Sequence, residues 1–99
     1  MSVQSFKNKA TEDIACGRVT KAALRLLPKM LHRKAQIKIT RIDSASSLQD
    51  LKELKGNRLE ALKGDRADQH SIRINDQYRL CFRWKDNNAS DVEIVDYHK

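Results

Sequence analysis

Apolar residues recur at helical spacing in the first half of the chain. Between positions 27 and 42 they follow one another every three or four residues, as Leu27, Leu31, Ala35, Ile39 and Ile42. This pattern predicts a helix over residues 28–45 with one buried stripe, and Pro28 suits its first position. Two shorter helices are predicted on either side: one over residues 7–16, which Gly17 would end, and one over residues 48–54, which a preceding serine would cap.

The second half of the chain changes to a period of two, which is typical of strands. Tyr78, Leu80, Phe82 and Trp84 fall on one face, whereas Arg79, Cys81 and Arg83 fall on the other. Further strands are predicted over residues 58–62, 69–75 and 92–98. The connections between them are short, so neighbouring strands must be antiparallel. These elements predict an α+β fold, in which two to three N-terminal helices pack on one face of a small, largely antiparallel sheet.

The length and composition of the chain limit its organisation. Its 99 residues suffice for one modest core, so residues 1–99 are expected to form a single domain. Apolar runs long enough to span a bilayer and a secretory signal are both missing from the sequence, which favours the cytoplasm and predicts no membrane association. Cys16 and Cys81 are expected to be free thiols, and no His, Cys and carboxylate set has metal-ligand spacing. Neither a metal nor another cofactor is therefore expected.

The charge is strongly and unevenly basic. The formal net charge is +7, and the segment from Ile14 to Ile42 contains eight basic residues and no acidic one. Such a segment predicts a nucleic-acid surface, with Lys29, Arg33 and Lys34 as its RNA-binding residues. A solvated helix face and a docking surface for an acidic protein are the alternatives that charge alone leaves open.

Three arginines are predicted on one uncovered face of the sheet. Arg73, Arg79 and Arg83 all alternate away from the apolar side of their strands. Like charges on one face favour an anionic ligand, so this face is predicted to bind phosphate. The alternative for Arg79 is an ordinary surface ion pair with Glu93 or Asp91.

Three ordered motifs stand out in the second half of the chain. They are the run Arg-Leu-Glu-Ala-Leu-Lys-Gly-Asp at residues 58–65, the hairpin Ser-Ile-Arg-Ile-Asn-Asp-Gln-Tyr-Arg at residues 71–79 and the ending Asp-Tyr-His at residues 96–98. Together they resemble the HigB-type toxins of the RelE/ParE superfamily, also called plasmid-maintenance killer proteins. The resemblance implies a RelE-like microbial RNase fold and the toxin of a type II toxin–antitoxin system. It also implies an endoribonuclease that cuts messenger RNA on the ribosome, and a cognate helix-turn-helix antitoxin of the HigA type.

The resemblance also implies a set of active-site positions. They fall on Glu60, Lys63, Asn75, Arg79, Asp96, Tyr97 and His98. Two of them depart from better-known members, because Glu60 stands where those carry a histidine and Asn75 where they carry an arginine. A glutamate can act as a base but is weaker than an imidazole, and a lost arginine removes a phosphate contact. Slower cleavage or an altered codon preference is therefore expected.

Metal-independent RNA cleavage explains why these residue types are needed. The ribose 2′-hydroxyl attacks the adjacent phosphorus, so a base, an acid and cations around the phosphoryl oxygens are required. Arg79 offers a planar fork for phosphate and Lys63 a point charge, whereas His98 is the best acid or base candidate. Asp96 is expected to orient a neighbouring cation, and Tyr97 to stack on a base or hydrogen-bond a phosphate.

Three other functions remain open on the sequence. One is a ParE-like gyrase inhibitor, although the terminal Asp96-Tyr97-His98 set favours a nuclease. Another is a weakly catalytic toxin that acts by binding ribosomes or their assembly intermediates, which the Glu60 and Asn75 departures favour. A third is an RNA-binding protein without activity. Met30 and Ile37 are apolar residues on the basic helix that would mark where the antitoxin docks.

Overall fold

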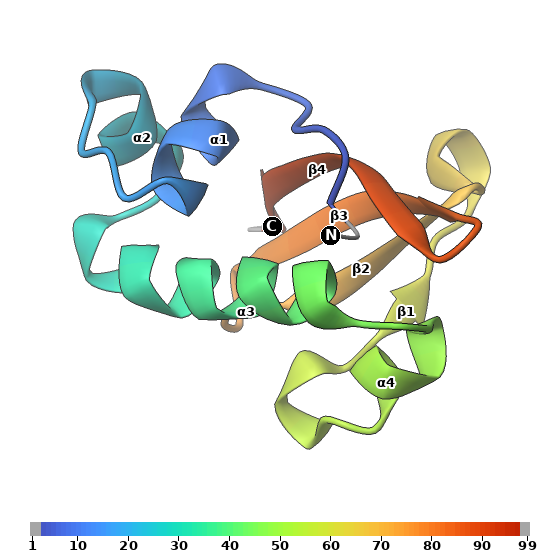
Figure 1. Cartoon of the computed structure of the whole chain (residues 1–99). Coiled ribbons are helices and arrows are strands. Elements are labelled where there is room, and N and C mark those ends of the chain that lie inside the picture. Colours follow the sequence, from blue (N-terminus) through green and yellow to red (C-terminus); the bar gives the residue numbers. More distant parts are fainter. Residues whose placement is uncertain (1–2, 98–99) are drawn as a thin grey trace.

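The N-terminal half folds into helices, as the apolar pattern predicts (Figure 1). The structure is a computed structural model, and it describes residues 3–97. Within these residues, the α-helices are α1 (Lys9–Ala15), α2 (Lys21–Leu26), α3 (His32–Ser44) and α4 (Leu48–Lys52). Short 3-10 helices are η1 (Lys29–Leu31), η2 (Lys55–Asn57) and η3 (Gly64–Arg66). Among residues 3–97, no helix has the length and apolarity needed to cross a membrane.

Side-chain caps set the starts of the short helices. The Asn8 side chain accepts from the Thr11 backbone N–H at 2.8 Å, and the Thr20 hydroxyl accepts from the Ala23 N–H at 3.1 Å. Ser47 caps α4 in the same way, which confirms the prediction of a serine cap before residue 48. Caps of this kind each contribute roughly 1 kcal/mol, which matters because helices of five to seven residues are marginal on their own.

Several helix boundaries differ from the predicted ones, most of all the start of the long helix. The long helix begins at His32 instead of Pro28, because Pro28 is extended (ψ 138°) and only a 3-10 turn follows it. His32 is buried, and its ring Nε2–H donates to the Leu27 carbonyl at 2.8 Å, which fixes the entry into α3. Helix α2 was not expected, since its six residues carry no apolar stripe long enough to detect.

The second half forms an antiparallel sheet of four strands, in the order β1-β2-β3-β4. Its strands are β1 (Glu60–Ala61), β2 (Gln69–Arg73), β3 (Tyr78–Lys85) and β4 (Asn88–Asp96). The first strand is shorter than the predicted range 58–62. The segment before α1 lies along β4 in the parallel direction, through bridges of Val3 to Ala89 and Phe6 to Val92. The predicted α+β architecture with a largely antiparallel sheet is confirmed.

The tight connection between β3 and β4 uses residues suited to left-handed backbone. Asp86 (φ 52°) and Asn87 (φ 62°) form a two-residue turn, the type whose twist matches the flanking strands. A bulge follows, where the register shifts between Cys81 and Arg83 and Asp91 has φ 50°. The bulge bends β4 so that its later residues can continue beside β3 up to the pair Tyr78 and Asp96.

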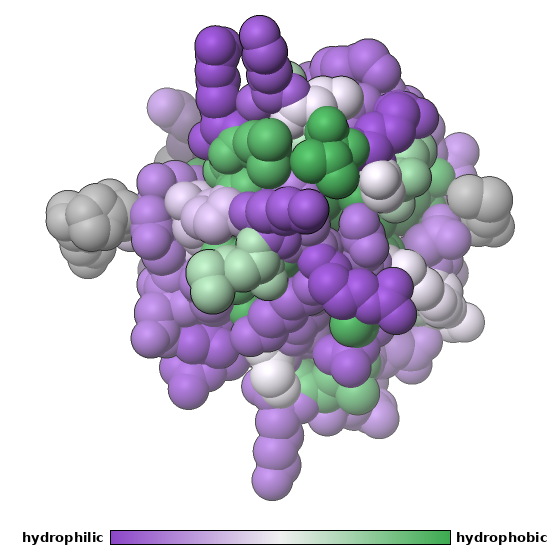
Figure 2. Space-filling model, turned by 90° about the vertical axis from the view of Figure 1, so that its left-hand side faces the viewer, coloured by the Kyte–Doolittle hydropathy of each residue, from purple (hydrophilic) through white to green (hydrophobic). Residues whose placement is uncertain are grey.

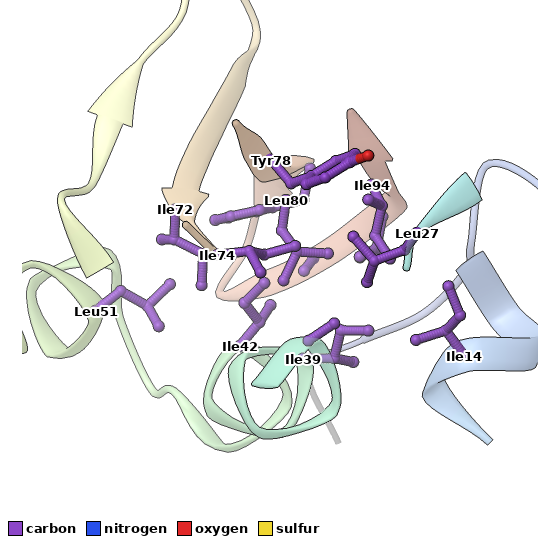
Figure 3. Close-up of a cluster of buried hydrophobic side chains, with 14 of the residues drawn as sticks. Ile14, Leu27, Ile39, Ile42, Leu51, Ile72, Ile74, Tyr78, Leu80 and Ile94 are labelled. Atoms are coloured by element: carbon purple, nitrogen blue, oxygen red, sulfur yellow. The ribbon is translucent and has the colours of Figure 1, made fainter. Parts of the chain in front are cut away.

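The hydrophobic core lies between α3 and one face of the sheet. Figure 3 shows Ile39 and Ile42 of α3 facing Ile72, Leu80 and Ile94 of the strands, and all five side chains are buried. Each such side chain contributes roughly 1.5–3 kcal/mol on burial. Helix α3 crosses beneath the sheet in Figure 1, with α1 and α2 at one end and α4 near β1 at the other. The opposite face of the sheet is left for polar residues.

Candidate active site

An open hollow of about 320 Å³ lies at the end of the sheet where the β2–β3 hairpin, the chain before β1 and the end of β4 meet. We call it the arginine hollow. Its lining residues are Arg58, Glu60, Arg73, Asn75, Asp76, Arg79 and Tyr97. Five of these seven are residues that the sequence predicted as functional, so residues up to 37 positions apart are brought to one place.

Several hydrogen bonds fix the side chain of Arg79 in the arginine hollow. Its side chain is only 11% exposed, and its Nε–H donates to the Ser71 hydroxyl at 2.8 Å. One terminal nitrogen, Nη2, donates to the backbone carbonyls of Arg58 at 2.5 Å and Ser71 at 3.3 Å. The other, Nη1, lies 3.8 Å from a carboxylate oxygen of Glu60. Fixed donors of this kind restrict the guanidinium to one orientation before any ligand arrives.

These contacts correct the prediction of an uncovered arginine face. Arg79 is buried and its carboxylate neighbour is Glu60, so the alternative of a surface ion pair with Glu93 or Asp91 does not hold. Glu93 pairs with Arg66 at 2.7 Å. The face is therefore neutralised locally because carboxylates from several elements reach its arginines.

Arg73 lies beside Arg79 in the sheet. The two residues are direct partners in the register of β2 and β3, so both side chains leave the same face. Arg73 forms an ion pair with Asp76, whose carboxylate is almost fully exposed. The Arg73 guanidinium lowers the pKa of Asp76, to which Arg58 and Lys34 also contribute. An exposed pair of this kind is weak, so an incoming anion can replace Asp76.

Glu60 and Tyr97 border the arginine hollow from opposite strands. Glu60 comes from β1, and its side chain is 58% exposed. Tyr97 follows β4, and its hydroxyl lies 3.7 Å from the Sγ of the buried Cys81. Burial, together with this thiol, raises the pKa of Tyr97, so its phenol keeps its proton at neutral pH. Tyr97 can therefore donate a hydrogen bond into the hollow.

Asn75 stabilises the hairpin. Its side-chain oxygen accepts from the backbone N–H groups of Gln77 at 2.9 Å and Tyr78 at 2.8 Å, which closes the turn between β2 and β3. The asparagine at this position thus supports the backbone that carries Arg73 and Arg79. The side-chain oxygen of Asn75 is therefore occupied in the turn. That this position has lost a phosphate contact stays a prediction.

Several predicted site residues lie outside the arginine hollow. Lys63 is exposed just before η3, and Asp96 accepts from the Gln77 side chain at 3.2 Å. Arg83 pairs with Asp68 and with Asp91, near the far end of β3. His98 lies outside the described residues.

The other predicted basic residues lie on η1 and in the first turn of α3. Lys29, Arg33 and Lys34 are all exposed, and none of them lines the arginine hollow. The charge of Lys34 contributes, after those of Arg73 and Arg58, to the lowered pKa of Asp76.

Sequence reasoning missed Arg58 and Asp76 as lining residues. Asp76 was interpreted only as part of a turn. Arg58 has left-handed backbone (φ 44°), which nothing in its neighbours indicates, and this conformation aims its carbonyl at Arg79. Cys16 and Cys81 are both free, as predicted. Within residues 3–97, His, Cys, Asp and Glu side chains form no group of three or more that could hold a metal ion.

Comparison with known protein families decides the relationship of the chain. A family model described as "RelE-like toxin of type II toxin-antitoxin system HigB" matches residues 19–98. The chain belongs to this HigB-like toxin family. This HigB-like toxin is also 39% identical over 75 residues to Toxin HigB-1 of Vibrio cholerae serotype O1, which covers 76% of this chain and 78% of that relative. The predicted resemblance is confirmed.

Solved structures agree on the fold of this HigB-like toxin. It is similar to YoeB in a YoeB–YefM complex from Staphylococcus aureus, with a TM-score of 0.62, 21% identity and full coverage of both chains. A YoeB dimer from the same organism gives a TM-score of 0.61 at 21% identity, again with full coverage of both. These likenesses confirm the predicted RelE-like fold.

Proposed function

We propose that this HigB-like toxin is an endoribonuclease that cuts messenger RNA on the translating ribosome by metal-independent attack of a ribose 2′-hydroxyl. The observation that carries the proposal is the pre-oriented guanidinium of Arg79, which faces a hollow shared with a carboxylate and two further arginines. Such an arrangement stabilises the non-bridging oxygens of a phosphate and the negative charge that develops on them in the transition state.

We assign the steps of the reaction to residues of the arginine hollow and to His98, which lies outside the described residues. The Glu60 carboxylate takes the proton of the 2′-hydroxyl, whose oxygen then bonds to phosphorus. Arg73 and Arg79 stabilise the negative charge on the phosphoryl oxygens, while Tyr97 donates a hydrogen bond to one of them. The bond to the 5′-oxygen breaks, and this oxygen receives a proton from His98. The products are a 2′,3′-cyclic phosphate and a free 5′-hydroxyl.

The ribosome supplies the substrate position that so small a protein lacks. The hollow is open and shallow, which suits a single nucleotide linkage presented by a larger body. Lys29, Arg33 and Lys34 on η1 and α3 would contact RNA phosphates beside it, and affinity from such contacts falls steeply with salt. Lys63 is assigned to the same phosphate-binding role from its exposed position before η3.

Arg79→Lys tests the proposed function because it keeps the positive charge and removes the guanidinium that Ser71 and Arg58 orient. Toxin is added to ribosomes that translate a defined message, and primer extension maps the new ends. The wild type should cut translated messages only, and Arg79→Lys should lower the rate about 100-fold. Arg25→Lys, an exposed site on α2, is the matched control and should cut normally.

The other outcomes select the remaining functions. If messages stay intact while translation stalls, the toxin acts by binding ribosomes and not by cleavage. The departures at Glu60 and Asn75 favour this alternative. Intact messages together with stalled DNA replication would indicate a gyrase inhibitor. Normal cleavage by Arg79→Lys would show that the Arg79 guanidinium is not needed for the reaction.

We also propose a cognate helix-turn-helix antitoxin that docks on the α2–α3 side of the molecule. Figure 2 shows this side, where apolar side chains lie among polar ones. Leu24 and Met30 are 44% and 87% exposed, and Ile37 of α3 is 40% exposed. The surrounding segment carries only positive charge, so an acidic amphipathic partner segment fits it. Met30→Asp should weaken the complex about tenfold or more in a titration, whereas Lys85→Asp should not.

A further inference from the structure

Lys38 is a buried lysine outside the arginine hollow. Its residue is only 4% exposed, on the inner side of α3. Its ammonium donates to the side-chain oxygen of Asn57 at 2.8 Å, and none of the ion pairs among residues 3–97 includes it. A buried cation without a carboxylate partner is unfavourable, and an apolar side chain would be more stable there. The lysine therefore needs an explanation other than packing.

The surroundings of Lys38 make its charge still less favourable. Burial, together with the charges of three nearby cations, lowers the pKa of Lys38 to about 8. Lys34 and Arg41 act from α3 itself, and Arg73 acts from β2. Arg73 is also one of the residues that line the arginine hollow.

Asn57 joins Lys38 to the chain before β1. Its side chain is fully buried at the end of η2. Its amide Nδ2 donates to the Leu51 carbonyl of α4 at 3.0 Å, and its backbone N–H donates to the Leu54 carbonyl at 2.9 Å. Asn57 is thus held from α3 on one side and from α4 on the other.

The residue after Asn57 is the one that holds Arg79. Arg58 has left-handed backbone (φ 44°, ψ 58°), a conformation that non-glycine residues adopt only when their surroundings require it. In this conformation its carbonyl accepts from Nη2 of Arg79 at 2.5 Å. A continuous path therefore runs from Lys38 through Asn57 and Arg58 to the guanidinium of Arg79.

We propose that Lys38 and Asn57 are positioning residues of the arginine hollow, which hold the backbone of Arg58 where its carbonyl orients the Arg79 guanidinium for an RNA phosphate. Neither residue touches the substrate. The RNA phosphate as the ligand of Arg79 rests on the proposed function, but the orientation of the Arg79 side chain is measurable without any cleavage.

The double variant Lys38→Met/Asn57→Leu separates positioning from stability. It removes both partners of the buried pair and leaves neither a cation nor a side-chain amide unpaired, so its melting temperature should stay within about 5 °C of the wild type. Lys55→Met is the matched control, because it removes the same charge from an exposed site in η2.

Three measurements follow the orientation of Arg79. Hydrogen exchange of its Nε–H, observed by nuclear magnetic resonance, should become at least about 10-fold faster in the double variant. Binding of inorganic phosphate, followed at the same resonance, should weaken about threefold or more. Cleavage of ribosome-bound message should fall about 10-fold or more, since a misplaced catalytic group loses rate steeply. Lys55→Met should change none of the three by more than about twofold.

Asn57→Asp provides a second test if the double variant does not fold. It keeps the oxygen that Lys38 contacts, gives the lysine a carboxylate and removes only the donor to Leu51. The Arg79 exchange rate should then stay within about threefold of the wild type, because the Lys38 contact is retained.

The outcomes distinguish this inference from the proposed function. Unchanged Arg79 exchange in a folded double variant would overturn the inference, as would an equal loss of protection in Asn57→Asp. Faster exchange and weaker phosphate binding, in a protein whose wild type cuts no RNA, would support the positioning role and overturn the nuclease.

Discussion

Arg73 of β2 and Arg79 of β3 stand directly opposite each other in the sheet, with both side chains on the face that carries the arginine hollow. Like charges opposed in this way destabilise a strand pair. Glu60 lies 3.8 Å from Arg79, and the exposed Asp76 pairs with Arg73, so the compensation comes from groups at the surface. The protein therefore retains an arrangement that an additional anion would stabilise.

Inorganic phosphate should raise the melting temperature of the toxin. Binding to the folded state alone adds RT ln(1 + [L]/Kd), about 1.4 kcal/mol at a phosphate concentration ten times its dissociation constant. Thermal unfolding in phosphate is compared with unfolding in chloride at equal ionic strength. Arg73→Gln should lose most of the increment, whereas Arg25→Gln should keep it. Equal melting temperatures in the two salts would contradict an anion site.

Glu60→His should increase cleavage of ribosome-bound message. An imidazole is a stronger base than a carboxylate, and a well-placed base contributes 100-fold or more, so a gain of about 10-fold is expected. Single-turnover rates measured from pH 5 to 8 should also show a new dependence on the imidazole titration. Arg79 should stay in place, because its other donors are bound to Ser71 and Arg58. No gain in rate would argue against Glu60 as the base.

Lys38 should make the toxin more stable as the pH rises from about 8 to 10.5. Burial lowers its pKa from 10.5 to about 8 in the folded protein, so the unfolded chain binds more protons in this interval. The cost of the buried charge is fully present below pH 8 and disappears as the lysine becomes neutral. Subtracting the unfolding free energy of Lys38→Met removes the other groups that titrate there. The difference should change by roughly 1–2 kcal/mol across the interval.

A flat difference between the wild type and Lys38→Met from pH 7 to 10.5 would mean that Lys38 titrates alike in both states. Lys55→Met serves as the control, because its exposed side chain should add no such change.

Asp13 should stabilise the toxin above about pH 4 and lose this effect as the pH falls toward 2. Arg18 donates to its carboxylate at 3.0 Å and Thr20 at 2.8 Å, and these bonds hold the pKa of the buried Asp13 at about 2. A lowered pKa in the folded state gives stability that protonation removes. Asp13→Asn should lower the melting temperature by several degrees at pH 7. The gap between variant and wild type should narrow steadily in acid, and a constant gap would contradict the assignment.

The elements that the sequence predicted well are those whose signals are local. Ser47 caps α4 because a hydroxyl can reach an N–H three residues away, and β3 alternates because its side chains point to opposite faces in turn. The helix over 28–45 was placed correctly in its core-facing part. Its start was wrong because Pro28 stays extended, and the buried contact of His32 with Leu27 decides where α3 begins.

The sequence predicted several residues that line the arginine hollow, but it did not predict the contacts that they make there. Five of the seven lining residues of the arginine hollow were predicted as functional from the sequence. Two of these five, Glu60 and Asn75, depart from the pattern of better-known family members. Arg79 was expected on an open face that binds phosphate, yet it is buried against Ser71 and Arg58. The alternation of β3 shows the direction of a side chain but not what covers it.

The sequence by itself determined most of the helices and strands, although not α2 or the start of α3, together with the antiparallel connections and the cationic character of one face. Each of these depends on residues a few positions apart. Only the tertiary structure decided that Arg58 adopts a left-handed backbone, that Lys38 donates to Asn57 and that the Arg58 carbonyl accepts from Arg79. The physical reason is distance along the chain. Lys38 and Asn57 are 19 positions apart, and Arg58 and Arg79 are 21 apart, so these contacts exist only after α3 and the sheet have packed together.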